Sequence, residues 1–209
     1  MPVKIKFCGI TREQDAQAAV ACGADAIGFV FHPASARYVA PQVARQIARD
    51  LPPFLCKVGL FVNVTSGEIA RVVDLVGLDI VQFHGDEAPA ECARSPRPWI
   101  KALRVAPGLD LAAACARYSA ASAWLFDTYD ASLYGGTGRA FDWRRIPTES
   151  ARPVILAGGL TVENVAGAIA AARPYAVDTS GGIEAAKGIK DRDKMQRFVA
   201  EVRRIEGAG

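Results

Sequence analysis

Short apolar runs alternate with amphipathic stretches along the whole chain, which predicts strands that take turns with helices. Several runs are continuously apolar, as expected when helices cover a parallel sheet. The predicted strands cover residues 3–8, 26–31, 56–62, 80–83, 99–103, 123–127, 154–157 and 175–178. Besides a helix that follows the first strand, helices are predicted over 41–50, 66–76, 109–118, 162–171 and 191–204.

The spacing of these strands predicts the fold class. Their starts recur at roughly 19 to 30 residues, which suits a small (β/α)8 TIM barrel. A doubly wound open sheet is the alternative, because periodicity does not distinguish a closed sheet from an open one. Eight strand–helix units leave little room for a second domain, so we expect one barrel domain over residues 1–209.

The composition excludes several functional classes. Of the 209 residues 51% are hydrophobic, enough for one substantial core. The net charge is only +3, from 25 basic and 22 acidic residues that are dispersed, so nucleic acid is not an expected partner. No apolar run predicts a signal segment or a membrane span. Five cysteines without a C-x-x-C pair argue against a disulfide framework and favour the cytoplasm.

The first strand predicts a reactive thiol. Cys8 stands at the end of a strand in which Ile5 and Phe7 alternate with lysines, and Gly9 then breaks the strand. We expect Thr11 to cap the following helix, which would place Cys8 beside a helix N-terminus that favours the thiolate. A buried, inert cysteine is the alternative interpretation.

Three further polar residues follow or end predicted strands, where parallel barrels bind ligands. His84 follows the fourth strand and either binds substrate or satisfies loop carbonyls. Asp127 ends the sixth, where partial desolvation favours a protonated carboxyl group, although it could simply cap loop amides. Asp178 ends the eighth beside a glycine-rich run, which we expect it to order next to the substrate.

Glycine pairs follow the last two strands and predict a phosphate site. Gly158 and Gly159 follow the seventh strand, and Ser180, Gly181 and Gly182 follow the eighth. Glycine lets main-chain N–H groups converge on an anion, and the corresponding loops of such barrels often bind phosphate. No nucleotide-binding motif is present, and two histidines with scattered carboxylates suggest no metal site.

The longest predicted loop, residues 128–140, contains Gly135-Gly136-Thr137-Gly138. It follows the sixth strand on the expected active-site side of the barrel. Loops of this length in compact domains are often lids or binding loops.

Several segments together resemble the phosphoribosylanthranilate isomerases of tryptophan biosynthesis over essentially the full length. They are Lys6-Phe7-Cys8-Gly9-Ile10-Thr11, Ser35-Ala36-Arg37-Tyr38-Val39, Val81-Gln82-Phe83-His84-Gly85-Asp86, Phe126-Asp127, Gly135-Gly136-Thr137-Gly138, Phe141-Asp142-Trp143, Leu156-Ala157-Gly158-Gly159-Leu160, Val177-Asp178-Thr179-Ser180 and Gly188-Ile189-Lys190-Asp191. Each segment is unspecific, but their order and spacing are highly specific.

The resemblance implies a barrel enzyme without metal or cofactor that performs an Amadori rearrangement of a phosphorylated substrate. It implies that Cys8 is the general base, that Asp127 is the general acid and that Arg37 holds the anthranilate carboxylate. Gly181 departs from the family, because it replaces the second serine of a frequent Ser-Ser-Gly. The sequence leaves monomer and homodimer open.

Besides a sugar-phosphate epimerase, two other functions share the expected phosphate site. The indole-forming synthase of the same pathway needs a lysine acid, for which Lys101 in the fifth strand is the candidate. A non-catalytic barrel that only binds phosphorylated ligands is the other alternative, but it would not need Cys8 and Asp127.

Overall fold

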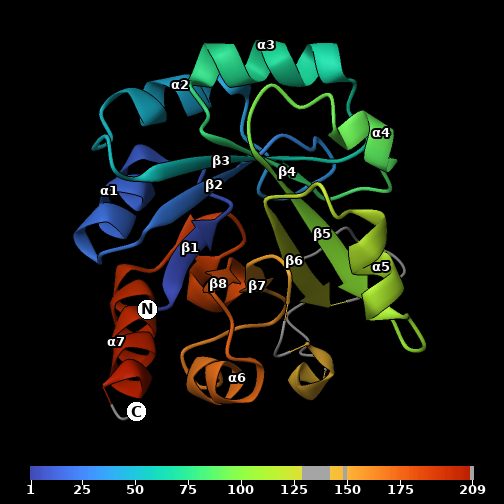
Figure 1. Cartoon of the computed structure of the whole chain (residues 1–209). Helices are drawn as coiled ribbons and strands as arrows, with labels where there is room; N and C mark the ends of the chain where they lie inside the picture. Colours follow the sequence, from blue (N-terminus) through green and yellow to red (C-terminus); the bar gives the residue numbers. More distant parts are fainter. Residues whose placement is uncertain (129–141, 148–149, 208–209) are drawn as a thin grey trace.

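Eight parallel strands form a closed barrel, and Figure 1 shows helices around it. The strands follow one another around the ring in chain order, and β8 pairs with β1 to close it. The computed structural model describes residues 1–128, 142–147 and 150–207. The barrel strands are β1 (Lys4–Cys8), β2 (Ala26–Val30), β3 (Cys56–Phe61), β4 (Ile80–Phe83), β5 (Trp99–Val105), β6 (Ala123–Thr128), β7 (Val154–Leu156) and β8 (Ala176–Thr179).

The helices lie on the outside of the barrel. They are α1 (Glu13–Ala21), α2 (Pro41–Arg49), α3 (Ser66–Val76), α4 (Pro89–Cys92), α5 (Leu111–Arg117), α6 (Val165–Ala172) and α7 (Arg192–Glu206). Two 3-10 turns, η1 (Trp143–Arg145) and η2 (Gly181–Ile183), follow β6 and β8. A small antiparallel hairpin of β9 (Glu184–Ala186) and β10 (Ile189–Lys190) precedes α7.

Alternate strand residues supply two separate apolar layers. Ile5 and Phe7 of β1 belong to the large core between barrel and helices, together with Phe198 of α7, whose ring centroid is 6.0 Å from that of Phe7. Ile100 of β5 and Leu125 of β6 belong to a smaller cluster inside the barrel. Because strand side chains alternate between faces, the residues that alternate with Ile5 and Phe7 point into the barrel.

The two ends of the chain meet beside β1. Figure 1 shows the start of β1 beside α7, and Arg203 of that helix donates to the main-chain oxygen of Val3 over 2.9 Å. Closure of the barrel therefore places the first strand against the last strand and the last helix.

The prediction of a single closed (β/α)8 barrel is confirmed, and the open-sheet alternative is excluded. Some local predictions are wrong. Arg12, not Thr11, occupies the N-cap of α1 and makes no side-chain cap, because the Thr11 hydroxyl instead donates to the Gly188 carbonyl over 2.6 Å. The predicted last helix begins after Asp191, which caps it by accepting from the Lys194 amide.

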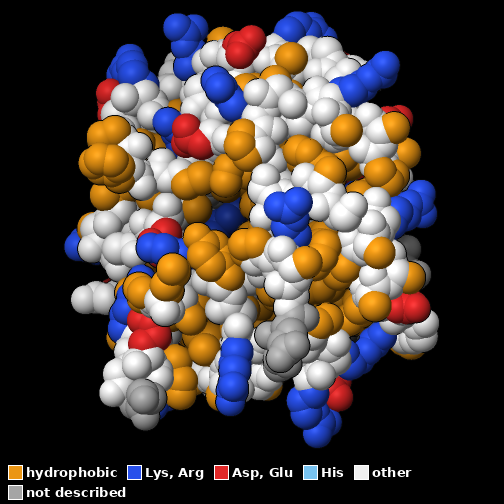
Figure 2. All heavy atoms as spheres, viewed as in Figure 1, with side chains coloured by type: hydrophobic (Ala, Val, Ile, Leu, Met, Phe, Trp, Pro, Cys, Tyr) orange, Lys and Arg blue, Asp and Glu red, His pale blue; other side chains and the backbone are white. Residues whose placement is uncertain are grey.

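The exposed surface carries no continuous basic area on the face drawn in Figure 2, where lysine and arginine side chains are interspersed with acidic ones. Within the described part of the chain, no helix is both long and apolar enough to cross a membrane. The loop predicted over 128–140 lies outside the described residues after Thr128, so its role stays a prediction.

Candidate active site

A cavity of about 270 Å³ opens at the carboxyl ends of the strands. All the predicted site residues line it. They are Cys8, Arg37, His84, Asp127, Gly158, Gly159, Asp178, Ser180, Gly181 and Gly182. The strand order explains the convergence, because parallel strands bring their carboxyl ends to one rim although these residues lie far apart in sequence.

Cys8 lies buried at the end of β1, directly opposite Gly28 of β2 in the strand register. A Cβ atom on Gly28 would lie only 2.9 Å from the sulfur, so glycine leaves room for the thiol. The Ser180 hydroxyl donates to the main-chain oxygen of Cys8 over 2.9 Å and ties β1 to the loop after β8. The thiol is therefore held in one place at the cavity wall.

Burial raises the pKa of the Cys8 thiol, and the nearby ammonium group of Lys6 acts against this effect. The prediction that a helix N-terminus lowers this pKa is therefore wrong. The reason is that α1 begins only at Glu13, so the turn that follows Cys8 separates the thiol from the helix N-terminus.

Lys6 and Asp178 form an ion pair of 2.9 Å inside the barrel, with side chains only 5% and 7% exposed. Burial opposes the charged lysine, but Asp178 and Cys8 outweigh it and raise the pKa of Lys6. The second carboxylate oxygen of Asp178, Oδ1, has no hydrogen-bond partner within the described residues. The expectation that Asp178 orders the adjacent glycine loop is wrong, because its carboxylate binds Lys6 instead.

Sequence reasoning missed Lys6, although a signal for it was present. Lys6 alternates with Ile5 and Phe7, which face the helices. In a barrel covered by helices, the opposite face of the strand lies inside. The position of Lys6 beside the predicted base therefore followed from the strand pattern once the barrel was assumed.

His84 lies against Asp127 on the opposite side of the cavity. Its Nε2 atom is 3.2 Å from Oδ2 of Asp127, close enough for an ion pair although not aligned as a hydrogen bond. Its other ring nitrogen lies 2.9 Å from the side-chain nitrogen of Gln82. Gln82 thus orients the His84 ring, and the ring packs against the carboxylate of Asp127, the predicted acid.

Asp127 is also fixed by the main chain. Its Oδ1 atom accepts from the Thr128 amide over 2.7 Å. Gly158 packs against this turn with φ of +82°, and a Cβ atom there would overlap the Thr128 amide and hydroxyl. A glycine at position 158 therefore permits the loop after β7 to approach Asp127.

The two glycine loops lie side by side. The Thr179 hydroxyl donates to the Leu160 carbonyl over 2.7 Å, and a Cβ atom on Gly182 would overlap that same carbonyl. The main-chain N–H groups of Gly158 and Gly159 donate to no acceptor among the described residues. Free N–H groups at adjoining glycine loops are suited to bind an anion.

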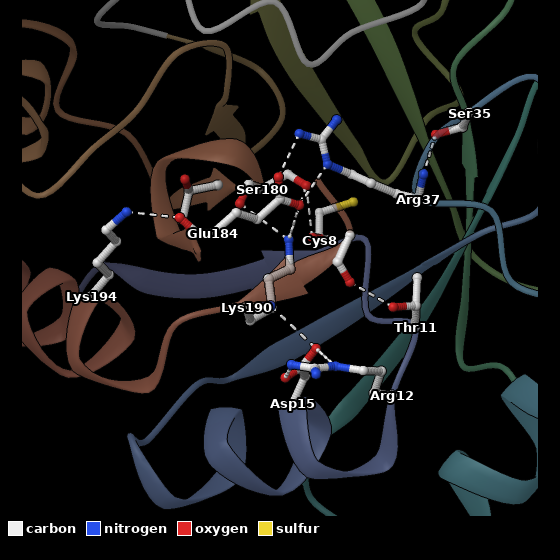
Figure 3. A network of polar contacts seen from close by, with 12 residues as sticks. Cys8, Thr11, Arg12, Asp15, Ser35, Arg37, Ser180, Glu184, Lys190 and Lys194 are labelled. Carbon is white, nitrogen blue, oxygen red and sulfur yellow. Dashed lines mark hydrogen bonds and ion pairs between the residues drawn. The ribbon is translucent and has the colours of Figure 1, made fainter. Parts of the chain in front are cut away.

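Arg37 extends from the loop after β2 toward the glycine loop after β8, and Figure 3 shows it within a network of charged side chains near Cys8. Its Nε and Nη2 atoms donate to the two carboxylate oxygens of Glu184, over 2.7 Å and 2.9 Å. Lys190 donates to Glu184 over 3.0 Å and to the Ser180 hydroxyl over 3.1 Å. Burial lowers the pKa of Lys190.

Sequence reasoning missed Glu184 and Lys190. Lys190 stood in a segment expected only to open the last helix, but it pairs with Glu184 in the hairpin of β9 and β10. A hairpin of this size leaves no clear periodic signal in the sequence.

Lys101, the candidate acid for a synthase, does not reach the cavity. It faces the helix layer, where it donates to Glu87 and to the Gly85 carbonyl, each over 2.7 Å. Its ammonium group also lies over the Tyr118 ring, 5.1 Å from the centroid. This orientation removes the only lysine that supported the synthase interpretation.

No group of three or more His, Cys, Asp or Glu side chains within residues 1–128, 142–147 and 150–207 could hold a metal ion. The reactive and charged groups that line the cavity are instead the thiol of Cys8, two carboxylates, two imidazoles and the guanidinium of Arg37. The fold and the placement of these groups are those of a (β/α)8-barrel enzyme whose site lies at the carboxyl ends of its strands.

Comparison with known proteins gives the family. The model of the N-(5'-phosphoribosyl)anthranilate (PRA) isomerase family matches residues 5–201, so the chain belongs to this family. N-(5'-phosphoribosyl)anthranilate isomerase of Pseudomonas fluorescens is 58% identical over 201 residues, which are 96% of this chain and 98% of the relative.

Solved structures agree with this assignment. The crystal structure of phosphoribosyl anthranilate isomerase from Thermotoga maritima has a TM-score of 0.90 at 41% identity and covers 96% of this chain and 98% of its own. A second isomerase structure, in complex with reduced 1-(o-carboxyphenylamino)-1-deoxyribulose 5-phosphate, has a TM-score of 0.87 at 40% identity and covers 96% of this chain and 98% of its own.

Proposed function

We propose that this chain converts N-(5-phosphoribosyl)anthranilate to 1-(2-carboxyphenylamino)-1-deoxy-D-ribulose 5-phosphate, an acid–base Amadori rearrangement in L-tryptophan biosynthesis. The observation that carries the proposal is the placement of Cys8 and Asp127 on the rim of one cavity. They lie at the carboxyl ends of β1 and β6, which are separated in the ring by β7 and β8, so each can reach a different atom of one substrate.

Asp127 is the proposed general acid. It donates a proton to the ring oxygen of the aminofuranose, while the nitrogen lone pair forms the iminium bond at C1 and the ring opens. The Thr128 amide donates to one oxygen of the carboxyl group, and the His84 ring lies 3.2 Å from the other.

Cys8 is the proposed general base. Its thiolate removes the proton from C2 of the iminium, which gives an enolamine, and this product gains a proton at C1 and loses one from its hydroxyl to become the ketone. Burial keeps the thiolate fraction small but makes the thiolate a stronger base. Lys6 beside it favours the thiolate electrostatically, the part that sequence reasoning assigned to a helix N-terminus.

The remaining residues bind the two ends of the substrate. We assign the phosphate to the main-chain N–H groups of Gly158, Gly159, Ser180, Gly181 and Gly182, because the Ser180 hydroxyl already donates to the Cys8 carbonyl. Arg37 is assigned to the anthranilate carboxylate, and Asp178, whose Oδ1 atom has no partner in the described residues, to a substrate hydroxyl. We also assign the reaction to the cytoplasm, where all five free cysteines would remain reduced.

Genetic complementation tests the proposal. The chain is expected to restore growth of a tryptophan auxotroph that lacks the isomerase, whereas the Asp127→Asn variant is not. A histidine auxotroph lacking the related aminoaldose isomerase, tested in parallel, reports any second substrate. A chain that binds phosphate ligands but fails to complement the tryptophan auxotroph would support the non-catalytic alternative.

A further inference from the structure

The way in which Arg37 meets Glu184 leaves one side of the guanidinium open. A guanidinium group has two edges that each present a pair of N–H donors. Glu184 occupies the edge formed by Nε and Nη2. Nη1 donates to no acceptor among the described residues, so the edge formed by Nη1 and Nη2 is available to a second carboxylate.

Glu184 is itself held rigidly. Its side chain is 5% exposed, and its Oε1 atom accepts from both Arg37 and Lys190. Lys190, with a side chain only 1% exposed, also donates to the Ser180 carbonyl and hydroxyl. The main-chain oxygen of Glu184 accepts from Lys194 of α7 over 2.7 Å. The carboxylate thus has two cationic partners, Arg37 and Lys190, whereas Lys194 contacts only the main chain.

The charges of this network are suited to an anionic substrate. Arg37 and Lys190 carry two positive charges and Glu184 one negative charge, so one positive charge remains for a ligand. Without Glu184 the guanidinium would retain its charge but lose the bidentate contact that sets its plane. Figure 3 shows the three side chains in contact beside Ser180 and Cys8.

We infer that Glu184 is a positioning residue for substrate recognition, because it holds one edge of Arg37 so that the other edge meets the anthranilate carboxylate. This inference rests on the proposed binding role of Arg37. It differs from a competitive role, in which Glu184 would occupy Arg37 until the substrate displaced it. The two roles predict opposite effects when the Glu184 carboxylate is removed.

A pair of matched ligands tests the inference. One is the reduced product analogue, reduced 1-(o-carboxyphenylamino)-1-deoxyribulose 5-phosphate, and the other is the same compound without its aromatic carboxylate. The ratio of their affinities, measured by calorimetry, isolates the contribution of the carboxylate. The part of the charge change that acts on the shared phosphate cancels in the ratio. The loss of repulsion between Glu184 and the ligand carboxylate would raise the ratio, so a fall in the ratio reports lost positioning of Arg37.

Glu184→Gln is expected to lower this affinity ratio about tenfold, within the range found when one member of a charged network is removed. In an Arg37→Ala background the same substitution should cause no further fall, because the guanidinium that it positions is absent. Lys194→Ala is the matched control. It removes a contact to the main chain of Glu184 and should leave the ratio unchanged.

A second variant protects the test against loss of folding. Glu184→Asp keeps the charge but is one methylene shorter, so it cannot reach both Nε and Nη2, and it should also lower the ratio. An unchanged or increased ratio in either Glu184 variant would overturn the inference. If Arg37→Ala itself leaves the ratio unchanged, the proposed role of Arg37 fails, which is a separate result.

Discussion

Lys6 and Asp178 are direct partners in the register of β1 and β8, and their side chains form an ion pair of 2.9 Å inside the barrel. Lys6 also acts on Cys8, whose thiolate it favours. Lys6 therefore both links the strands that close the barrel and favours the charged form of Cys8, the predicted base.

This pair has a measurable effect on stability. Lys6→Met leaves the Asp178 carboxylate buried without its partner and should lower the free energy of unfolding by about 3–5 kcal/mol. Lys4→Met is the control on the same strand, because the Lys4 side chain is 44% exposed in its contact with Asp25. It should cost at most about 1 kcal/mol. Denaturant unfolding at neutral pH measures both, and equal losses would contradict the prediction.

The ionisation of Cys8 can be followed directly. Because burial raises the pKa of its thiol, the midpoint should lie above the ordinary value of 9.0 in the ligand-free protein. Thiolate absorbance of the wild type minus that of Cys8→Ala, recorded against pH, reports this midpoint. Lys6→Met should move it further upward, since the ammonium that favours the thiolate is removed. A midpoint near neutral pH would restore the helix N-terminus explanation.

Loss of the base should affect turnover far more than binding. Cys8→Ala is expected to lower kcat by ~10²–10⁴-fold, the usual contribution of a positioned proton-transfer group, with the fold and affinity for the product analogue nearly intact. Steady-state kinetics and calorimetry provide the two measurements. Cys22→Ala removes a half-buried thiol outside the cavity and should leave kcat unchanged. A Cys8→Ala enzyme with near-normal kcat would remove Cys8 from the role of base.

Substitution of Asp127 should lower kcat far more than substitution of His84. Asp127→Asn removes the proton donor and should lower kcat by ~10²–10⁴-fold. His84→Asn keeps the donor but removes the ring that holds it, so a loss of roughly tenfold in kcat is expected. The exposed carboxylate of Asp74 offers a neutral control as Asp74→Asn. If His84→Asn were as inactive as Asp127→Asn, the imidazole would itself be a candidate acid.

The two glycine loops should respond to substitution in different ways. At Gly181 a Cβ atom meets only the flexible Arg37 side chain at 3.2 Å and the more distant Glu184. Gly181→Ala should therefore raise KM with little change in kcat, because phosphate is held alike in ground and transition states. Gly158→Ala should also lower kcat, since its Cβ atom would displace the turn that fixes Asp127.

Steady-state kinetics of both variants with the same substrate measure KM and kcat and so test both expectations. An unchanged KM in Gly181→Ala would place the phosphate elsewhere. An unchanged kcat in Gly158→Ala would show that the turn around Asp127 tolerates displacement.

The sequence by itself determined the repeated strand–helix unit and most of the residues that line the cavity. Strand runs such as 80–83 and helices such as 66–76 were predicted with the bounds that the structure shows, because their apolar period and turn residues are local. Residues at strand ends were also predictable. Once strands are parallel, Cys8, His84 and Asp127 must share one rim.

Only the tertiary structure decided which groups these residues meet. Arg37 and Glu184 are 147 residues apart, and Lys6 and Asp178 are 172 apart, so neither pair leaves a local pattern. Barrel closure also determined the direction in which strand side chains point. Lys6 and Lys101 both occupy strands, but the register turns Lys6 into the barrel and Lys101 toward Glu87. Side-chain period is a property of each strand alone, whereas the face that becomes the interior depends on how all eight strands close.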